Sequence, residues 1–200
     1  MYITCLDLEG VLVPEIWIAF AQETGIPELK KTTRDEPDYD KLMNYRIGIL
    51  KEHGLGLKEI QETIAKIDPM PGAKAFLDEL RSICQVIIIS DTFSQFAGPL
   101  MKKLGYPTIF CNELVVADSG EITGFKMRCE QSKLTTVKAL QSIGYDTIAS
   151  GDSHNDLGMI GASKAGFLFR STDAIKEEYP QYPAYETYAE LMEAIKKAMV

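Results

Sequence analysis

Short runs of nearly continuous apolar residues alternate along the chain with longer segments in which apolar residues recur every three or four positions. The runs are typical of parallel strands covered on both faces, and the spacing is typical of amphipathic helices. The alternation therefore predicts an α/β fold, a doubly wound, mainly parallel, Rossmann-like sheet with right-handed crossovers. The expected strands are residues 2–8, 85–90, 106–111, 146–152 and 165–170.

Two segments interrupt this alternation. Residues 15–68 contain no strand pattern and only helical spacing around a polar loop, and the sequence D-P-M-P-G at 68–72 marks the return to the alternation. We expect residues 15–68 to form a small inserted helical cap domain, and residues 1–14 together with 69–200 to form the α/β core. Residues 112–128 carry a D-S-G sequence between β-forming residues, which predicts a hairpin.

Composition and charge exclude several classes of protein. The 29 acidic and 21 basic residues give a net charge of −8, so we expect no non-specific nucleic-acid binding, which needs a basic surface. No apolar run approaches the roughly 18 residues of a membrane span, and the first residues lack the basic segment of a signal peptide. The four cysteines form no C-x-x-C pair, so we expect reduced thiols in a cytoplasmic protein.

Polar residues with catalytic chemistry follow the predicted strands, where ligands of open parallel sheets collect. Acidic groups from different strands would repel one another there unless a cation lay between them, and oxygen ligands of this kind suit Mg²⁺. A lysine at a helix start would add a second positive charge. The residues concerned are Asp7 and Glu9 after the first strand, Ser90 at the end of the second, Lys133 at a helix start, and Asp152, Asn155 and Asp156 after the fourth.

Together these motifs resemble the haloacid dehalogenase superfamily of phosphohydrolases: D-L-E-G-V at 7–11, then Ser90, then Lys133, then G-D-S-H-N-D at 151–156. The resemblance covers essentially the whole chain and implies Mg²⁺-dependent phosphoryl transfer by covalent catalysis. It implies that Asp7 is the nucleophile that becomes an aspartyl phosphate, and that Ser90 and Lys133 hold the phosphoryl oxygens. Asp7, Asp152 and the carbonyl of Glu9 would ligate Mg²⁺, and Asn155 and Asp156 would position the metal and its waters, with Asn155 also next to the substrate.

The sequence departs from this family pattern at two places. Glu9 stands where the family usually has aspartate, the general acid and then general base of the reaction. The extra methylene moves the carboxyl group by about one bond length, and a misplacement near 1 Å can cost about 100-fold in rate. Asp91 and Thr92 follow Ser90, where the phosphoserine phosphatase branch usually has glycines, and we expect both to contribute to the substrate site.

The predicted cap contains a cation at an unusual position. Arg46 falls at the centre of the apolar stripe of a helix that also carries Leu42, Met43 and Leu50. A buried charge needs a partner, and a substrate carboxylate would provide a bidentate one. Glu15 could receive an ammonium group in the same space, so the two side chains describe the zwitterionic end of an amino acid.

Glu15, Tyr39 and Arg46 match the substrate-recognition positions of phosphoserine phosphatases, and the chain resembles that branch. The D-L-E-G-V-L opening is similar to that of the subgroup that also transfers the phosphoryl group from phosphoserine to homoserine. The resemblance therefore implies a phosphorylated amino acid as substrate and either water or homoserine as acceptor. A homodimer is compatible with the sequence.

Structural interpretations remain open for the cap residues. Arg46 could form an internal salt bridge with Glu23 or Glu62, and Glu15 could be an ordinary acid at a helix start. Tyr39 could be a plain core residue.

Other functions also remain open. A phosphatase of another small phosphomonoester would carry the same motifs, and receiver domains in signalling also combine an aspartate, a serine or threonine, and a lysine on a parallel sheet. The long helical insertion, the second acid Glu9 and the loop at 151–156 argue against a receiver domain. No G-x-x-x-x-G-K-[ST] sequence occurs, so we expect no phosphoryl transfer from ATP.

Overall fold

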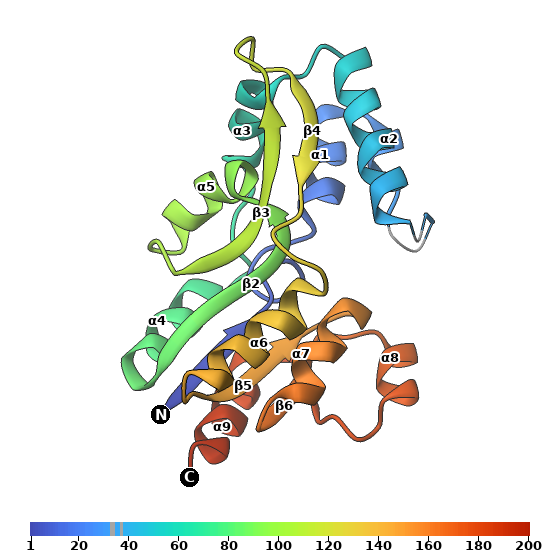
Figure 1. The fold of residues 1–200 in the computed structure, drawn as a ribbon. Coiled ribbons are helices and arrows are strands. Elements are labelled where there is room, and N and C mark those ends of the chain that lie inside the picture. Colours follow the sequence, from blue (N-terminus) through green and yellow to red (C-terminus); the bar gives the residue numbers. More distant parts are fainter. Residues whose placement is uncertain (33–34, 37) are drawn as a thin grey trace.

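The computed structural model describes residues 1–32, 35–36 and 38–200, and within them seven strands form one sheet in the order β4-β3-β2-β1-β5-β6-β7 (Figure 1). Neighbouring strands are parallel throughout, except for the antiparallel pair of β3 and β4. The doubly wound, mainly parallel sheet that the hydrophobic pattern predicts is confirmed. The strands are β1 (Tyr2–Leu6), β2 (Gln85–Phe93), β3 (Ile109–Val116), β4 (Ile122–Lys126), β5 (Asp146–Gly151), β6 (Ala165–Phe169) and β7 (Ala184–Tyr185).

Helices cover both faces of this sheet. Leu6 and Ile88 point to a core shared with α4 (Ala73–Ile83) and α9 (Tyr188–Ala198), whereas Cys5 and Ile87 point to a second core on the other face. Successive side chains of a strand point to opposite faces, so an almost wholly apolar strand is buried on both sides. The second core is formed with α6 (Ser132–Ser142), α7 (Leu157–Ala162) and α8 (Asp173–Glu178).

The helices of the predicted insertion lie together at one end of the molecule, and the β3–β4 hairpin reaches up among them (Figure 1). Leu57 donates a backbone hydrogen bond of 2.8 Å to the Gly120 carbonyl at the hairpin turn, and Trp17 meets Phe96 edge to face with ring centroids 5.3 Å apart. The insertion therefore shares a continuous apolar core with the hairpin and with α5. These elements are α1 (Ile16–Thr24), the 3₁₀ helix η1 (Pro27–Lys30), α2 (Tyr39–Glu52), α3 (Leu57–Ile64) and α5 (Ser94–Lys103).

Some predicted boundaries are wrong. Strand β2 does not end at Ser90 but continues to Phe93, with a shift in its pairing to β3 between Ile89 and Phe93. The predicted strand 106–111 and the first half of the predicted hairpin are one strand, β3, in which buried Asn112 and Leu114 alternate with exposed Glu113 and Val115. A polar residue on the buried side concealed this period of two from the hydrophobic pattern.

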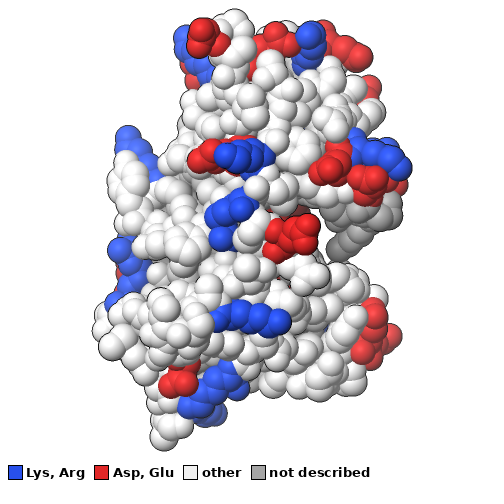
Figure 2. All heavy atoms as spheres, in the orientation of Figure 1, with Lys and Arg blue, Asp and Glu red and all other residues white. Residues whose placement is uncertain are grey.

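Charged side chains of both signs are interspersed on the face shown in Figure 2, and the outline of the molecule is indented between its upper and lower parts. The net charge of the chain is −8. Within the described residues, no helix has both the length and the apolar character that crossing a bilayer requires.

Candidate active site

A tight turn after β1 places Asp7 at the carboxyl edge of the sheet. The Asp7 amide donates a hydrogen bond to the Ser150 carbonyl of β5 at 3.0 Å, and Asp7 Oδ1 accepts a hydrogen bond of 2.7 Å from the Leu8 amide. Gly10 has a positive φ of 76°, and a Cβ built there would lie 2.4 Å from Asp152 Cγ. Glycine at this position therefore allows the turn to approach the Asp152 carboxylate closely.

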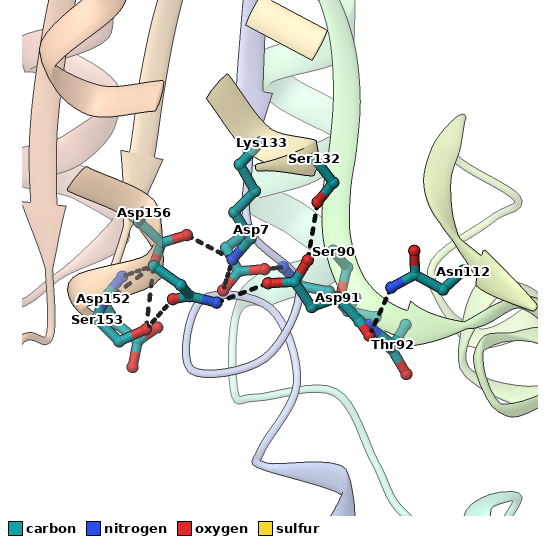
Figure 3. A network of polar contacts seen from close by, with 12 residues as sticks. Asp7, Ser90, Asp91, Thr92, Asn112, Ser132, Lys133, Asp152, Ser153 and Asp156 are labelled. Atoms are coloured by element: carbon teal, nitrogen blue, oxygen red, sulfur yellow. Dashed lines mark hydrogen bonds and ion pairs between the residues drawn. The ribbon is translucent and has the colours of Figure 1, made fainter. Parts of the chain in front are cut away.

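Lys133 lies between two buried carboxylates, as Figure 3 shows. Its Nζ is 2.9 Å from Asp7 Oδ2 and 2.6 Å from Asp156 Oδ1, and the lysine is only 3% exposed. Burial alone would lower the pKa of Lys133, but the Asp156 and Asp7 charges outweigh it and raise that pKa. The lysine is held in its charged form, with its ammonium group beside the Asp7 carboxylate.

A third carboxylate completes an acidic cluster. Single oxygens of Asp7, Asp152 and Asp156 all lie within 4.8 Å of one another. Burial is the main cause, and the charge of Asp156 the second, of the raised pKa values of the other two carboxyl groups. The pKa of Asp7 lies well above its usual range, and that of Asp152 is about 7. One lysine cannot neutralise three carboxylates, and an all-oxygen donor set of this kind fits a small hard cation such as Mg²⁺.

The loop after β5 is organised by Asp156, which is fully buried. Its Oδ2 accepts backbone hydrogen bonds from Asp152 and Ser153, both at 3.0 Å. A Cβ at Gly151 would lie 2.1 Å from the Asp156 Cγ atom, so that carboxyl group occupies the space that only glycine leaves free. Because Oδ1 holds Lys133, Asp156 connects the loop to the lysine.

Ser90, Asp91 and Thr92 lie near the end of β2, and Asp91 contacts this loop. Ser90 is 2% exposed, and its Oγ accepts a hydrogen bond of 3.2 Å from the Thr92 amide. The Asp91 carboxylate accepts hydrogen bonds from Ser132 Oγ at 2.8 Å and from Asn155 Nδ2 at 2.9 Å (Figure 3). The structure thus brings the candidate residues near the end of β2 close to those of the helix start and of the loop.

Glu9 joins the turn after β1 to the first helix of the insertion. Its Oε2 accepts a hydrogen bond of 2.8 Å from the amide of Ile16, the first residue of α1. Burial, and then the charge of Glu15, raises the pKa of Glu9 to about 8. A carboxyl group with this pKa can carry a proton at neutral pH and also release it.

Arg46 is buried in α2, at the place where its position in the apolar stripe predicts burial. Its Nη2 donates to the Lys31 carbonyl at 2.8 Å, and the guanidinium carbon lies 4.5 Å from the ring centre of Trp17. Its Nε is buried and has no hydrogen-bond partner in the described part of the chain. Burial lowers the pKa of Arg46 to about 10.

The structure contradicts the alternative in which Arg46 forms a salt bridge with Glu23 or Glu62. Glu23 lies 3.9 Å from Lys66 and Glu62 lies 4.0 Å from Lys58, on the surface of the insertion. The helical stripe predicts which face is buried, but it does not predict which neighbours meet that face.

The other two residues expected to recognise substrate lie at helix starts. Glu15 is exposed at the N-cap position of α1, where its side chain makes no capping hydrogen bond. Tyr39, the first residue of α2, is half-buried, and its hydroxyl donates to the Asp91 carbonyl at 3.2 Å. Tyr39 is therefore a contact between the insertion and the end of β2.

A cavity of about 500 Å³ opens between Tyr39, Asp91 and Lys133. Sequence reasoning missed part of its wall, the loop between β4 and α6, which has no periodic pattern. It also missed Ser132, although its place beside Lys133 at a helix start was a usable signal. The missed lining residues are Met127, Cys129, Glu130, Gln131, Ser132, Leu134 and Gly158.

Comparison with known proteins identifies the family of the chain. The haloacid dehalogenase-like hydrolase family matches residues 5–164. A phosphoserine phosphatase named ThrH from Pseudomonas aeruginosa is 52% identical over 198 residues, which cover 99% of this chain and 97% of that protein. A phosphoserine phosphatase from Pseudomonas syringae pv. tomato is 50% identical over 196 residues, which cover 98% of this chain and 83% of that protein.

Solved structures share the fold. The structure of a substrate-bound phosphoserine phosphatase complex has a TM-score of 0.78 at 24% identity, covering 98% of this chain and 97% of that one. A phospho-aspartyl intermediate analogue of phosphoserine phosphatase has a TM-score of 0.77 at 22% identity, covering 96% and 98%. From the family match and the full-length relatives, we conclude that the chain belongs to the haloacid dehalogenase-like hydrolase family, in the branch of the phosphoserine phosphatases.

Proposed function

We propose that the protein hydrolyses phosphoserine through a phosphorylated Asp7. The observation that carries this proposal is the buried Asp7 carboxylate, paired at 2.9 Å with Lys133 and grouped with two further carboxylates at the edge of the sheet. A carboxylate in this position can attack phosphorus, because the lysine and a bound cation would reduce the repulsion between two anions. The 52% identical relative that is named a phosphoserine phosphatase supports the same conclusion.

The reaction has two steps. A carboxylate oxygen of Asp7 forms a bond to phosphorus, the bond from phosphorus to the serine oxygen breaks, and Glu9 gives its proton to that oxygen. Glu9 then takes a proton from water, the water oxygen attacks phosphorus, and the bond to Asp7 breaks. The raised pKa of Glu9, about 8, suits the first role at neutral pH. Ser90 and Lys133 would hold the phosphoryl oxygens throughout.

Mg²⁺ is the cofactor in this proposal. Asp7, Asp152, Asp156 and the main-chain carbonyl of Glu9 would hold it, and the mutual proximity of the three carboxylates supports this assignment. When bound, the ion would supply positive charge against the phosphate.

Recognition of the amino-acid end falls to the insertion. The buried Nε of Arg46 has no partner among the described residues and would bind a substrate carboxylate. Glu15, at the start of α1, would receive the ammonium group. Tyr39, Thr92 and Asn155 complete the proposed substrate site, and the division into a core of 1–14 with 69–200 and a cap of 15–68 is part of the same proposal.

Homoserine is the proposed second acceptor. Glu9 can take a proton from a hydroxyl group as well as from water, and the amino-acid end of homoserine would reuse the contacts of Glu15 and Arg46. Homodimer formation stays a prediction of the sequence.

The experiment that tests the function offers phosphoserine carrying labelled phosphate, with Mg²⁺, in the presence and absence of homoserine. We expect labelled inorganic phosphate in both cases, and labelled phosphohomoserine when homoserine is present. Asp7→Asn should abolish both products while circular dichroism stays unchanged. A lasting phosphorylated Asp7 formed from acetyl phosphate, with no turnover of any phosphomonoester, would instead favour a receiver domain.

A further inference from the structure

Asp91 is the meeting point of four separate parts of the chain. Its carboxylate accepts hydrogen bonds from Ser132 at the start of α6 and from Asn155 in the 3₁₀ helix η2 (His154–Asp156). Its main-chain carbonyl accepts hydrogen bonds from Asn112 Nδ2 of β3 at 3.0 Å and from the Tyr39 hydroxyl of α2 at 3.2 Å. One residue near the end of β2 therefore connects the sheet, α6, η2 and the insertion, and Figure 3 shows its contacts with Ser132 and Asn112.

Asp91 itself and two of its four partners, Ser132 and Asn155, each lie one residue away from a candidate catalytic group. Ser90 precedes Asp91, Lys133 follows Ser132, and Asp156 follows Asn155. The Asp91 carboxylate thus fixes the spacing between three groups that come from separate elements. Because a misplacement of about 1 Å can cost about 100-fold in rate, this spacing affects the chemical step directly.

The contact with Ser132 is supported by a polar network in which the exposed Arg128 joins the buried Asn112 and Thr136. Asn112 and Thr136 are 1% and 3% exposed. The Arg128 amide donates to Asn112 Oδ1 at 3.0 Å, and Arg128 Nη2 donates to Thr136 Oγ1 at 2.7 Å and to the Ser132 carbonyl at 3.3 Å. Because the Asp91 carboxylate is charged, the hydrogen bond that it accepts from Ser132 is stronger than one between neutral groups.

We propose that Asp91, which the sequence analysis expects in the substrate site, is instead a positioning residue, whose carboxylate aligns Ser90, Lys133 and the loop at 151–156 for phosphoryl transfer without contacting the substrate itself. Each carboxylate oxygen already accepts a hydrogen bond from a protein side chain, so the direction of both oxygens is fixed by Ser132 and Asn155. The inference rests on the proposed function.

The test compares Asp91→Asn, Ser132→Ala and the double variant. The asparagine introduced by Asp91→Asn would keep the shape of the side chain but remove its charge and place a second amide donor beside one of its two partners. Each variant is assayed with phosphoserine and with p-nitrophenyl phosphate, a phosphomonoester that lacks the amino-acid end. Asp118→Asn, at an exposed position in the hairpin turn, is the matched control, and thermal unfolding checks that each variant folds.

We expect Asp91→Asn to lower kcat about tenfold or more for both substrates, with KM changing less than kcat. Ser132→Ala should cause a similar but smaller loss, and the double variant should lose no more than Asp91→Asn alone, because both changes remove the same alignment. Asp118→Asn should match the wild type. If Asp91→Asn does not fold, Ser132→Ala provides the test: a lower kcat for both substrates, with KM changing less than kcat, supports the inference.

Three results would overturn the inference: a raised KM for phosphoserine alone, which indicates direct contact with the substrate; an unchanged kcat; or independent losses that multiply in the double variant. Wild-type protein that hydrolyses p-nitrophenyl phosphate but not phosphoserine would overturn the proposed substrate and leave the Asp91 test intact. Wild-type protein that hydrolyses neither would overturn both.

Discussion

The Glu9 carboxylate accepts a hydrogen bond of 2.8 Å from the amide of Ile16, and it thereby caps the helix that begins the insertion. Glu15 occupies the usual capping position of that helix but makes no such bond. A carboxylate at a helix N-terminus satisfies a free amide and interacts favourably with the helix dipole. The same side chain therefore lies within the proposed reaction site and anchors the proposed substrate-recognition element.

Glu9→Gln separates these two properties. The glutamine amide oxygen can still accept the hydrogen bond from Ile16, but the side chain can no longer transfer a proton. We expect a fall in kcat for phosphoserine of about 100-fold or more, with a melting temperature close to that of the wild type. Steady-state kinetics and calorimetry measure the two effects.

The intermediate gives a second measure of the same variant. Without a base for the second step, phosphorylated Asp7 should accumulate in Glu9→Gln when p-nitrophenyl phosphate, whose leaving group needs no acid, is the donor. Intact-protein mass spectrometry after rapid acid quenching would detect the added phosphate. Wild-type turnover by the variant would show that Glu9 is not the acid and base.

Arg46→Ala tests recognition of the amino-acid end. Removing a charged hydrogen-bond donor costs about 1.5–3 kcal/mol, so KM for phosphoserine should rise by about 10- to 100-fold. KM for p-nitrophenyl phosphate should change little, because that substrate has no carboxylate to bind. Arg46→Lys keeps the positive charge but loses the planar guanidinium group, so its KM for phosphoserine should lie between those of the wild type and Arg46→Ala. Equal losses on both substrates would remove Arg46 from recognition.

Removal of divalent cations should destabilise the protein, and more so at high pH. Burial and the neighbouring Asp156 raise the folded-state pKa of Asp152 to about 7, above the value near 4 of an unfolded aspartate. The protonated form of Asp152 stabilises the folded state relative to the ionised form. In metal-free protein this contribution to the free energy of unfolding is therefore lost as pH rises from about 4 through 7. A bound cation reverses this by stabilising the ionised form.

We therefore expect saturating Mg²⁺ to raise the melting temperature over protein in EDTA by about 5 °C or more at pH 8, and by less at pH 6. Asp152→Asn removes one of the repelling charges, so it should raise the metal-free melting temperature at pH 8 and abolish the response to Mg²⁺. Lys196, at the surface of α9, provides a control: Lys196→Ala should leave the response unchanged. An equal response at both pH values would contradict the argument.

The sequence was sufficient to predict the residues at the strand ends, because the carboxyl ends of parallel strands must meet at one edge of the sheet. Asp7 and Asp152 come together for this reason, whereas Lys133 and Asp156 reach them from the start of α6 and from η2. It was also sufficient to predict that Arg46 is buried, because helical spacing defines a face.

What the sequence could not predict were contacts made by segments that approach from elsewhere. Arg46 meets the Lys31 carbonyl and the Trp17 ring, and the β3–β4 hairpin joins the insertion through Gly120. Periodicity and motif spacing do not predict how such elements are placed relative to one another, because this placement depends on the packing of the whole chain.

Gly10→Ala should damage the site beyond the cost of backbone strain. A Cβ at Gly10 would lie 2.4 Å from Asp152 Cγ, and φ there is 76°. The matched control is Gly25→Ala at the end of α1, where φ is 69° but no atom lies within 4 Å of the added Cβ. The left-handed conformation costs both variants about 1–2 kcal/mol, so any further effect of Gly10→Ala comes from displacement of Asp152.

Both variants should therefore lose a few degrees of melting temperature in EDTA, because about 1 kcal/mol shifts a chain of this size by about 2–4 °C. Only Gly10→Ala should also lose the stabilisation by Mg²⁺ and most of kcat, since Asp152 must move to make room for the methyl group. Titration calorimetry with Mg²⁺ separates loss of binding from loss of stability. If Gly10→Ala and Gly25→Ala bound Mg²⁺ equally well, the close approach of this turn to Asp152 would have no part in holding the ion.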